Sequence, residues 1–161
     1  MKITIHRHES NNSYLVKLAG EMNHQTLDAL HELAEYEDIQ KCIFDFKDVV
    51  HFELCGVMQW LNFTYDFFSN KEVIYQNCRT QWLMLIRQIP QIMNHVTLDS
   101  IIAEYVCHEC DDFSEETISA DDHSEYLNDP ENKEKRCESC FSGSIDIIEN
   151  EQDLFFFFTA A

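Results

Sequence analysis

Two Cys-x-x-Cys pairs constrain the fold of this chain more than any other feature of its sequence. Cys107 and Cys110 form the first pair, Cys137 and Cys140 form the second, and 26 residues separate the two pairs. Each pair presents two thiolates from one reversal of the chain, so the two together supply the four ligands of a tetrahedral Zn²⁺ site. Because four thiolates leave no open coordination position, we expect a structural and not a catalytic zinc ion.

A pair of redox-active dithiols is the competing interpretation of the same cysteines. A thioredoxin-type Cys-x-x-Cys pair opens a helix inside a βαβ unit. Here the segment YVCHECDDF ends a strand-like run and enters an acidic loop. This context favours metal binding, with His108 facing solvent between the two ligands.

The segment after Cys140 predicts a small β-hairpin. Ile145, Ile147 and Ile148 form its first strand, ENEQ forms the turn, and residues 154–158 form its second strand. Four consecutive phenylalanines on a strand point to both faces, so both faces need a cover, either the rest of this chain or another chain. The two cysteine pairs and the hairpin together predict a zinc-ribbon-like module over residues 104–161.

This module is strongly acidic. Residues 104–161 hold 17 acidic and 3 basic side chains, within a chain whose formal net charge is −19. The spacer of residues 111–136 carries ten of these acids, and its composition predicts a disordered loop or a loose helix. A negative field of this size repels phosphate backbones, so we do not expect a nucleic-acid partner.

Nothing in the sequence predicts insertion into a membrane. No segment approaches the roughly 20 apolar residues of a membrane-spanning helix. The start, MKITIHRHES, lacks the apolar core of a signal peptide. We therefore expect a cytoplasmic protein, in which disulfides are disfavoured and paired cysteines are available to a metal.

The first hundred residues predict one α/β domain, residues 1–103. Strands are expected at MKITIHRHES, SYLVKLAG, KCIFDF, KEVIYQN and HVTLDSIIAEYV. Helices are expected at NHQTLDALHELAEYE, GVMQWLNFTYDFFSN and RTQWLMLIRQI, the last closed by Pro90. The order ββαβαβαβ predicts a mixed sheet with helices crossing between its strands.

Two segments of this domain resemble the STAS domain of anti-sigma-factor antagonists. The family's first motif is roughly G-x-L-D-x-x-T-A-x-x-L, and it is matched by Gly20, Glu21, Met22, Asn23, Thr26, Leu27 and Leu30, conservatively at Met22 and Asn23. Its second motif is D-L-S-x-V-x-F-x-D-S-[ST]-G-[LV], and it is matched by Asp45, Phe46, Val49, Phe52, Glu53, Gly56 and Val57. The resemblance covers residues 1–100 and leaves the cysteine module outside. It implies a STAS-like mixed sheet.

The resemblance also implies a function and a departure from it. In the family, the first serine of D-S-[ST]-G is phosphorylated by a partner kinase that doubles as the anti-sigma factor. Leu54 occupies that position here and has no hydroxyl group. The family's partner surface surrounds the start of this helix, which implies partner contacts by Leu54, Cys55, Gly56, Met58 and Gln59. We expect a non-enzymatic interaction module of bacterial signalling or of a cytoplasmic assembly, with an anti-sigma-factor-like kinase or an assembly subunit as partner.

An enzyme or thiol-based sensor that uses Cys55 or the paired cysteines is the alternative. Cys55 lies where a helix begins, and His51 precedes it by four residues. The chain has only three glycines, which makes oxyanion and phosphate loops hard to build. We therefore interpret Cys55 as a half-buried replacement for serine, and Cys42 and Cys78 as core residues.

Large apolar side chains offer further partner contacts. The candidates are Trp60, Tyr65, Phe67, Trp82 and the run of residues 155–158. The sequence leaves open whether the partner is another protein or a second copy of this chain.

Overall fold

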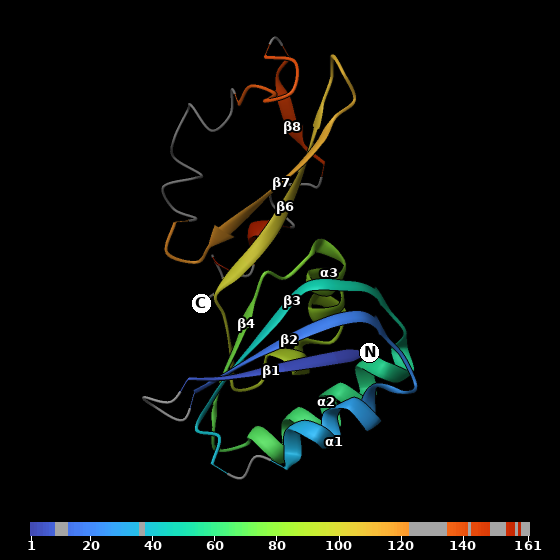
Figure 1. Cartoon of the computed structure of the whole chain (residues 1–161), viewed down its shortest axis with the longest axis vertical. Helices are drawn as coiled ribbons and strands as arrows, with labels where there is room; N and C mark the ends of the chain where they lie inside the picture. The colour runs from blue at the N-terminus through green and yellow to red at the C-terminus, as the bar shows by residue number, and fades with distance from the viewer. Residues whose placement is uncertain are drawn as a thin grey trace. The chain divides into compact units, whose positions relative to one another are not determined.

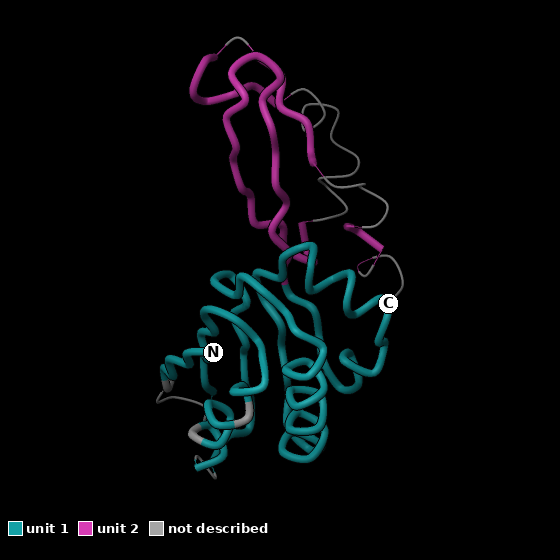
Figure 2. The backbone as a smooth tube through the Cα atoms, turned by 90° about the vertical axis from the view of Figure 1, so that its right-hand side faces the viewer, with its two compact units in different colours: residues 1–99 teal, residues 100–161 magenta. Residues whose placement is uncertain are grey.

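The computed structural model describes residues 1–8, 13–35, 38–122, 135–141, 143–148, 154–156 and 158. The chain divides into two compact units, Met1–Asp99 and Ser100–Ala161 (Figure 2). The division falls between two strands that belong to different sheets. In the described parts of the chain, no helix is both long enough and apolar enough to cross a membrane.

The first unit is a mixed five-stranded sheet with crossing helices (Figure 1). Strand β1 pairs antiparallel with β2, whereas β2, β3, β4 and β5 run parallel to one another in that order. This confirms the predicted order ββαβαβαβ. The elements are β1 (Lys2–His8), β2 (Ser13–Met22), α1 (Thr26–Ala34), β3 (Lys41–Phe52), α2 (Leu54–Phe68), β4 (Glu72–Gln76), α3 (Thr80–Gln88), the 3₁₀ helix η1 (Pro90–Met93) and β5 (Val96–Leu98).

An aromatic core lies between one face of this sheet and the helices. Alternate residues of β3, including Phe44 and Phe46, are fully buried on that face. The centre of the Phe46 ring lies 5.5 Å from that of Trp60 in α2 and 4.7 Å from that of Trp82 in α3, so both helices cover the same face. Helix α1 packs beside α2 (Figure 1). Trp60 and Trp82 are fully buried, and their prediction as partner contacts is wrong because both tryptophans fill this core.

The predicted last strand of this domain is two strands in two sheets. Strand β5 pairs with β4 from Val96 to Leu98 only, because β4 itself ends at Gln76, the residue after the partner of Leu98. The Asp99 amide then donates to the Tyr75 carbonyl oxygen at 2.8 Å. From Ser100 onward the chain does not pair with the first sheet. It forms β6 (Ser100–Cys107) of the second unit.

The second unit is a three-stranded antiparallel sheet in the order β7–β6–β8. Strand β7 (Phe113–Ser119) comes from the acidic spacer, so the prediction of a loop is wrong for these residues. Seven residues of β7 pair with β6, and the carboxylates of Glu115 and Glu116 remain exposed, so the strand buries no charge. The spacer residues 123–134 lie outside the described residues.

The predicted C-terminal hairpin is also absent from the described residues. Strand β8 (Ile145–Ile147) pairs with β6 and not with residues 154–158. Leu154 to Phe156 are helical, with Leu154 and Phe155 buried and Phe156 exposed. Short apolar runs are compatible with either a strand or a helix. Here β8 pairs with the edge of β6 opposite β7. Phe157 lies outside the described residues.

Candidate metal centre and the start of helix α2

The four paired cysteines come together at one end of the second sheet. Their sulfur atoms all lie within 4.8 Å of one another. The Cys107 Sγ is 3.7 Å from the Cys140 Sγ, and the Cys110 Sγ is 3.6 Å from the Cys137 Sγ. Zn–S bonds of about 2.3 Å in a tetrahedron place two sulfurs roughly 3.8 Å apart. The sulfur positions therefore fit a four-thiolate metal ion.

Each cysteine pair is held by the same backbone turn. In the first knuckle (Cys107–Cys110), the Asp111 amide donates to the Cys107 carbonyl oxygen at 3.0 Å. In the second knuckle (Cys137–Cys140), the Phe141 amide donates to the Cys137 carbonyl oxygen at 2.9 Å. Asp111 and Phe141 both adopt positive φ, 54° and 59°. A left-handed residue at the same place in each knuckle ends the turn and leaves its two sulfurs on one side.

Gly143 permits the close approach of the two knuckles. Its carbonyl oxygen accepts from the Cys137 amide at 2.9 Å, which pairs the second knuckle with the chain that leads into β8. A methyl group on Gly143 would lie 2.6 Å from the Cys107 Sγ and 2.9 Å from the Glu109 Cγ. Only glycine fits here. Gly143 was not predicted as a site residue, although it is one of only three glycines in the sequence and lies three residues after Cys140.

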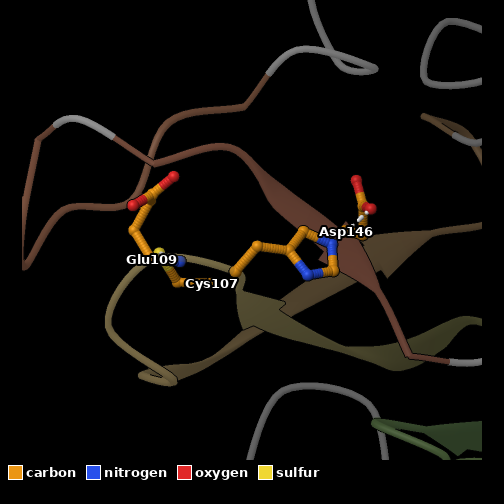
Figure 3. Close-up of polar contacts among 4 residues, drawn as sticks. Cys107, Glu109 and Asp146 are labelled. Carbon is orange, nitrogen blue, oxygen red and sulfur yellow. Dashed lines mark hydrogen bonds and ion pairs between the residues drawn. The ribbon is translucent and has the colours of Figure 1, made fainter.

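Polar contacts surround the first knuckle. The Glu109 amide lies 3.4 Å from the Cys107 Sγ, to which it donates (Figure 3). Such N–H contacts stabilise a thiolate. The His108 Nε2 lies 2.6 Å from the Asp146 Oδ2, and both side chains are exposed. His108 is therefore solvent-facing as predicted, and it connects the knuckle with β8.

The second knuckle is joined to β7 by side-chain contacts. The Lys135 Nζ pairs with the Glu116 carboxylate and lies 5.1 Å from the centre of the Tyr105 ring. The Tyr105 hydroxyl donates to the same carboxylate at 3.0 Å. The Ser139 hydroxyl donates to Asp112. A cavity of about 550 Å³ lies between these contacts, with Cys137 in its wall. These contacts thus connect the three strands of the second sheet and both knuckles around the four sulfur atoms.

The second candidate site is the junction of β3 and α2. The Glu53 amide donates to the Met22 carbonyl oxygen at 2.8 Å, so the two segments that resemble STAS motifs meet in space. Gly56 is buried at this contact, where a methyl group would lie 2.5 Å from the backbone of Met22 and Asn23. The first turn of α2 is therefore packed directly on the end of β2.

Some residues near Gly56 point to solvent. Leu54, the first residue of α2, is 65% exposed and Met58 is 44% exposed, whereas Gln59 is half-buried. Cys55 is exposed and not half-buried as predicted, because it projects away from the side of the first turn that Gly56 packs on β2. Its sulfur lies 3.5 Å from the Glu53 carboxylate, and no described imidazole or ammonium group contacts it.

Helix α2 also carries exposed apolar residues beside its buried side. Leu54, Met58, Leu61 and Tyr65 recur at spacings of four, three and four residues, which places them on one side of the helix. We call these four residues the apolar stripe. Tyr65 is 62% exposed and Leu61 is half-buried, whereas the buried side of α2 holds Gly56, Val57, Trp60 and Phe68. Phe67 is half-buried, and its ring stacks on the ring of Phe63 with 5.3 Å between the ring centres.

Cys42 and Cys78 are core residues, as predicted. Both side chains are fully buried. Burial raises the pKa of the Cys42 thiol far above its usual range. Burial, with smaller contributions from Asp45 and Asp99, raises the pKa of the Cys78 thiol in the same direction. Neither thiol is available as a thiolate nucleophile at neutral pH.

Comparisons with known proteins give a distant structural likeness and no match in sequence. No protein-family model and no curated protein matches the sequence. Among solved structures, the chain is similar to the anti-sigma factor antagonist SpoIIAA in its unphosphorylated form. The TM-score is 0.43 and the identity 14%, over 60% of this chain and 86% of that chain. A likeness of this distance indicates no function.

Proposed function

We propose that this chain is a non-enzymatic, STAS-like protein-interaction module that binds a protein partner through the apolar stripe of α2. Its C-terminal unit is organised by a structural Zn²⁺ ion bound to Cys107, Cys110, Cys137 and Cys140. The module acts in bacterial signalling of the anti-sigma-factor-antagonist type or in a cytoplasmic assembly.

The observation that carries this proposal is that the apolar surface of α2 extends beyond its buried side. A helix that covers a sheet needs one apolar face, and its remaining surface is ordinarily polar. Asp66 is the one charged residue of α2. The apolar stripe lies beside the buried side and exposes Leu54, Met58 and Tyr65, each 44% or more exposed. Exposed apolar side chains gathered on one helix face are typical of a protein interface.

The resemblance to STAS motifs points to the same surface. In that family the partner surface surrounds the start of the second helix, and here the stripe begins at Leu54, the first residue of α2. The phosphoacceptor serine is replaced by Leu54, which adds apolar area to the surface. We therefore propose an interaction that does not depend on phosphorylation of this helix.

The metal part of the proposal rests on the sulfur geometry. Two cross-knuckle distances of 3.6 and 3.7 Å match the edges of a zinc–thiolate tetrahedron. Among its described residues, the second unit buries fewer large side chains than the first, so we propose that a bound metal supplies folding free energy to it.

Photo-crosslinking in the native cell tests the interaction surface. A photoreactive amino acid at Met58 should crosslink one defined protein, whereas the same residue at Met84 of α3 should not. Met84 is the matched control because it is 42% exposed on another helix, against 44% for Met58. Tyr65→Glu should abolish the crosslink from position 58.

Two results would contradict the proposal. Equal crosslinking from positions 58 and 84 would show that the stripe is not the interface. A purified chain that holds no zinc after expression in zinc-containing medium would refute the metal part. A crosslink between two copies of the chain would identify the partner as a second copy and retain the surface.

A further inference from the structure

We propose that the four knuckle thiolates are an oxidation site for hydrogen peroxide, at which two disulfides form between the knuckles and expel the metal. The predicted pairs are Cys107–Cys140 and Cys110–Cys137. This inference rests on the zinc site of the proposed function and adds a chemical response to it.

The distances are compatible with these pairs. Each pair joins the first cysteine of one knuckle to the second cysteine of the other, at sulfur separations of 3.7 and 3.6 Å. A disulfide bond is about 2.05 Å long, so each pair closes by a movement of less than about 2 Å. Both pairs can close without sharing a sulfur atom.

The exposure of the cysteines predicts which thiolate of each pair is oxidised first. Cys110 is exposed and its partner Cys137 is buried, whereas Cys140 is half-buried and its partner Cys107 is buried. Peroxide attack follows thiolate character and access, and a bound metal keeps these thiols deprotonated. Each pair therefore holds one accessible thiolate, which reacts first, and one buried thiolate positioned to resolve it.

The chemistry balances with peroxide alone. The Cys110 thiolate attacks one peroxide oxygen, the O–O bond breaks, and a sulfenic acid and hydroxide form. The Cys137 thiolate then attacks the oxidised sulfur and forms the S–S bond with loss of a second hydroxide. Two thiolates lose two electrons and one peroxide is reduced. The Cys140–Cys107 pair repeats these steps, so two peroxides are consumed for each metal ion released.

Cross-knuckle and within-knuckle disulfides differ in how much they stabilise the oxidised chain. The cross-knuckle bonds span 33 and 27 residues, whereas a bond within one knuckle closes a turn of four. Cross-links over long loops remove more entropy from the unfolded chain. They also replace the link between the knuckles that the metal provided. Oxidised protein should therefore keep the pairing of β6 with β8 (Figure 1).

Peroxide titration of the zinc-loaded full chain tests the inference. We expect zinc release, followed with a chromogenic chelator, to saturate at about two peroxides per zinc ion. Glu109 lies between the cysteines of the first knuckle and Glu138 between those of the second. Cleavage after glutamate therefore separates all four cysteines, and mass spectrometry of the fragments identifies each disulfide without ambiguity.

The control is Cys55→Ser, which removes the exposed thiol outside the site. This variant should release zinc at the same rate and stoichiometry as the parent chain. Dithiothreitol and zinc should then restore the metal-bound protein.

Other results overturn the inference. Disulfides within the knuckles, zinc retention in excess peroxide, or release that depends on Cys55 would each show that the cross-knuckle pairs are not the oxidation site. A zinc-bound but peroxide-inert chain would leave the proposed function intact. A chain that binds no zinc would refute both proposals.

Discussion

Gly143 determines how closely the two knuckles approach. A methyl group at this position would lie 2.6 Å from the Cys107 sulfur, well inside van der Waals contact. Overpacking of this kind costs about 1–3 kcal/mol, so Gly143→Ala should weaken zinc binding by about tenfold. Competition with a zinc chelator measures the change.

Ser144→Ala is the matched control for this substitution, since Ser144 is the exposed neighbour of Gly143. It should leave zinc affinity unchanged. Equal affinities for all three proteins would mean that the knuckles have room to separate.

Phe141 is strained by its backbone conformation. It adopts φ of 59° with its side chain 77% exposed, so the phenyl ring contributes little packing to offset the left-handed geometry. This conformation costs a residue with a Cβ atom about 1 kcal/mol or more, and glycine avoids the cost. Phe141→Gly should therefore bind zinc about fivefold more tightly than Phe141→Ala, which loses the same ring but keeps the Cβ atom. An alanine variant as tight as the glycine variant would rule out strain.

The packing of helix α2 against β2 depends on Gly56. Alanine has higher helix propensity than glycine by about 1 kcal/mol. A methyl group here would nevertheless lie 2.5 Å from the backbone of β2, which cannot rotate away. The steric clash should outweigh the gain in helix propensity, so Gly56→Ala should lower the free energy of unfolding of the first unit by about 2 kcal/mol.

Tryptophan fluorescence in urea measures this change, because both tryptophans of the chain belong to the first unit. Cys55→Ala, one residue earlier and exposed, should change stability by less than about 0.5 kcal/mol. Unchanged stability of Gly56→Ala would show that α2 can move off β2.

The start of α2 should also lack regulation by phosphate. Leu54 occupies the position of the family's phosphoacceptor serine, and the Thr64 hydroxyl, further along the same helix, donates to the Leu61 carbonyl oxygen at 3.1 Å. We expect phosphoproteomics of the native cell to find no phosphorylated residue from Val49 to Thr64. Leu54→Ser should restore no regulation in the absence of a matching kinase. A phosphate at Thr64 would contradict this expectation.

At the scale of the whole molecule, metal removal should separate the two units. Structural zinc is worth roughly 10–16 kcal/mol in small zinc-finger peptides at neutral pH. The first unit has its own aromatic core and contains no ligand of the site. Chelation or Cys137→Ser should therefore abolish hydrogen-exchange protection in residues 100–161 and leave the strands of Met1–Asp99 protected.

The apolar residues Leu154 and Phe155, buried in the folded chain, should then become exposed and promote aggregation. Light scattering before and after chelation checks this. Simultaneous loss of protection in both units would contradict their independence, and full protection without metal would contradict a structural zinc ion.

The sequence by itself determined the order of elements from β1 to β5 and the grouping of the four cysteines. Both depend on short-range patterns. Apolar periodicity distinguishes strand from helix within a dozen residues, and Cys-x-x-Cys spacing places two thiolates on one turn.

The tertiary structure alone decided which apolar residues are buried. The apolar surface of helix α2 is wider than the side that is buried, so its sequence does not reveal that Trp60 packs inward while Met58 points to solvent. The acidic spacer became β7 because β6 offered it a hydrogen-bonding partner over seven residues. Gly143 matters because a sulfur 36 residues earlier in the chain lies beside it. These outcomes depend on contacts between distant segments, which local composition and spacing do not encode.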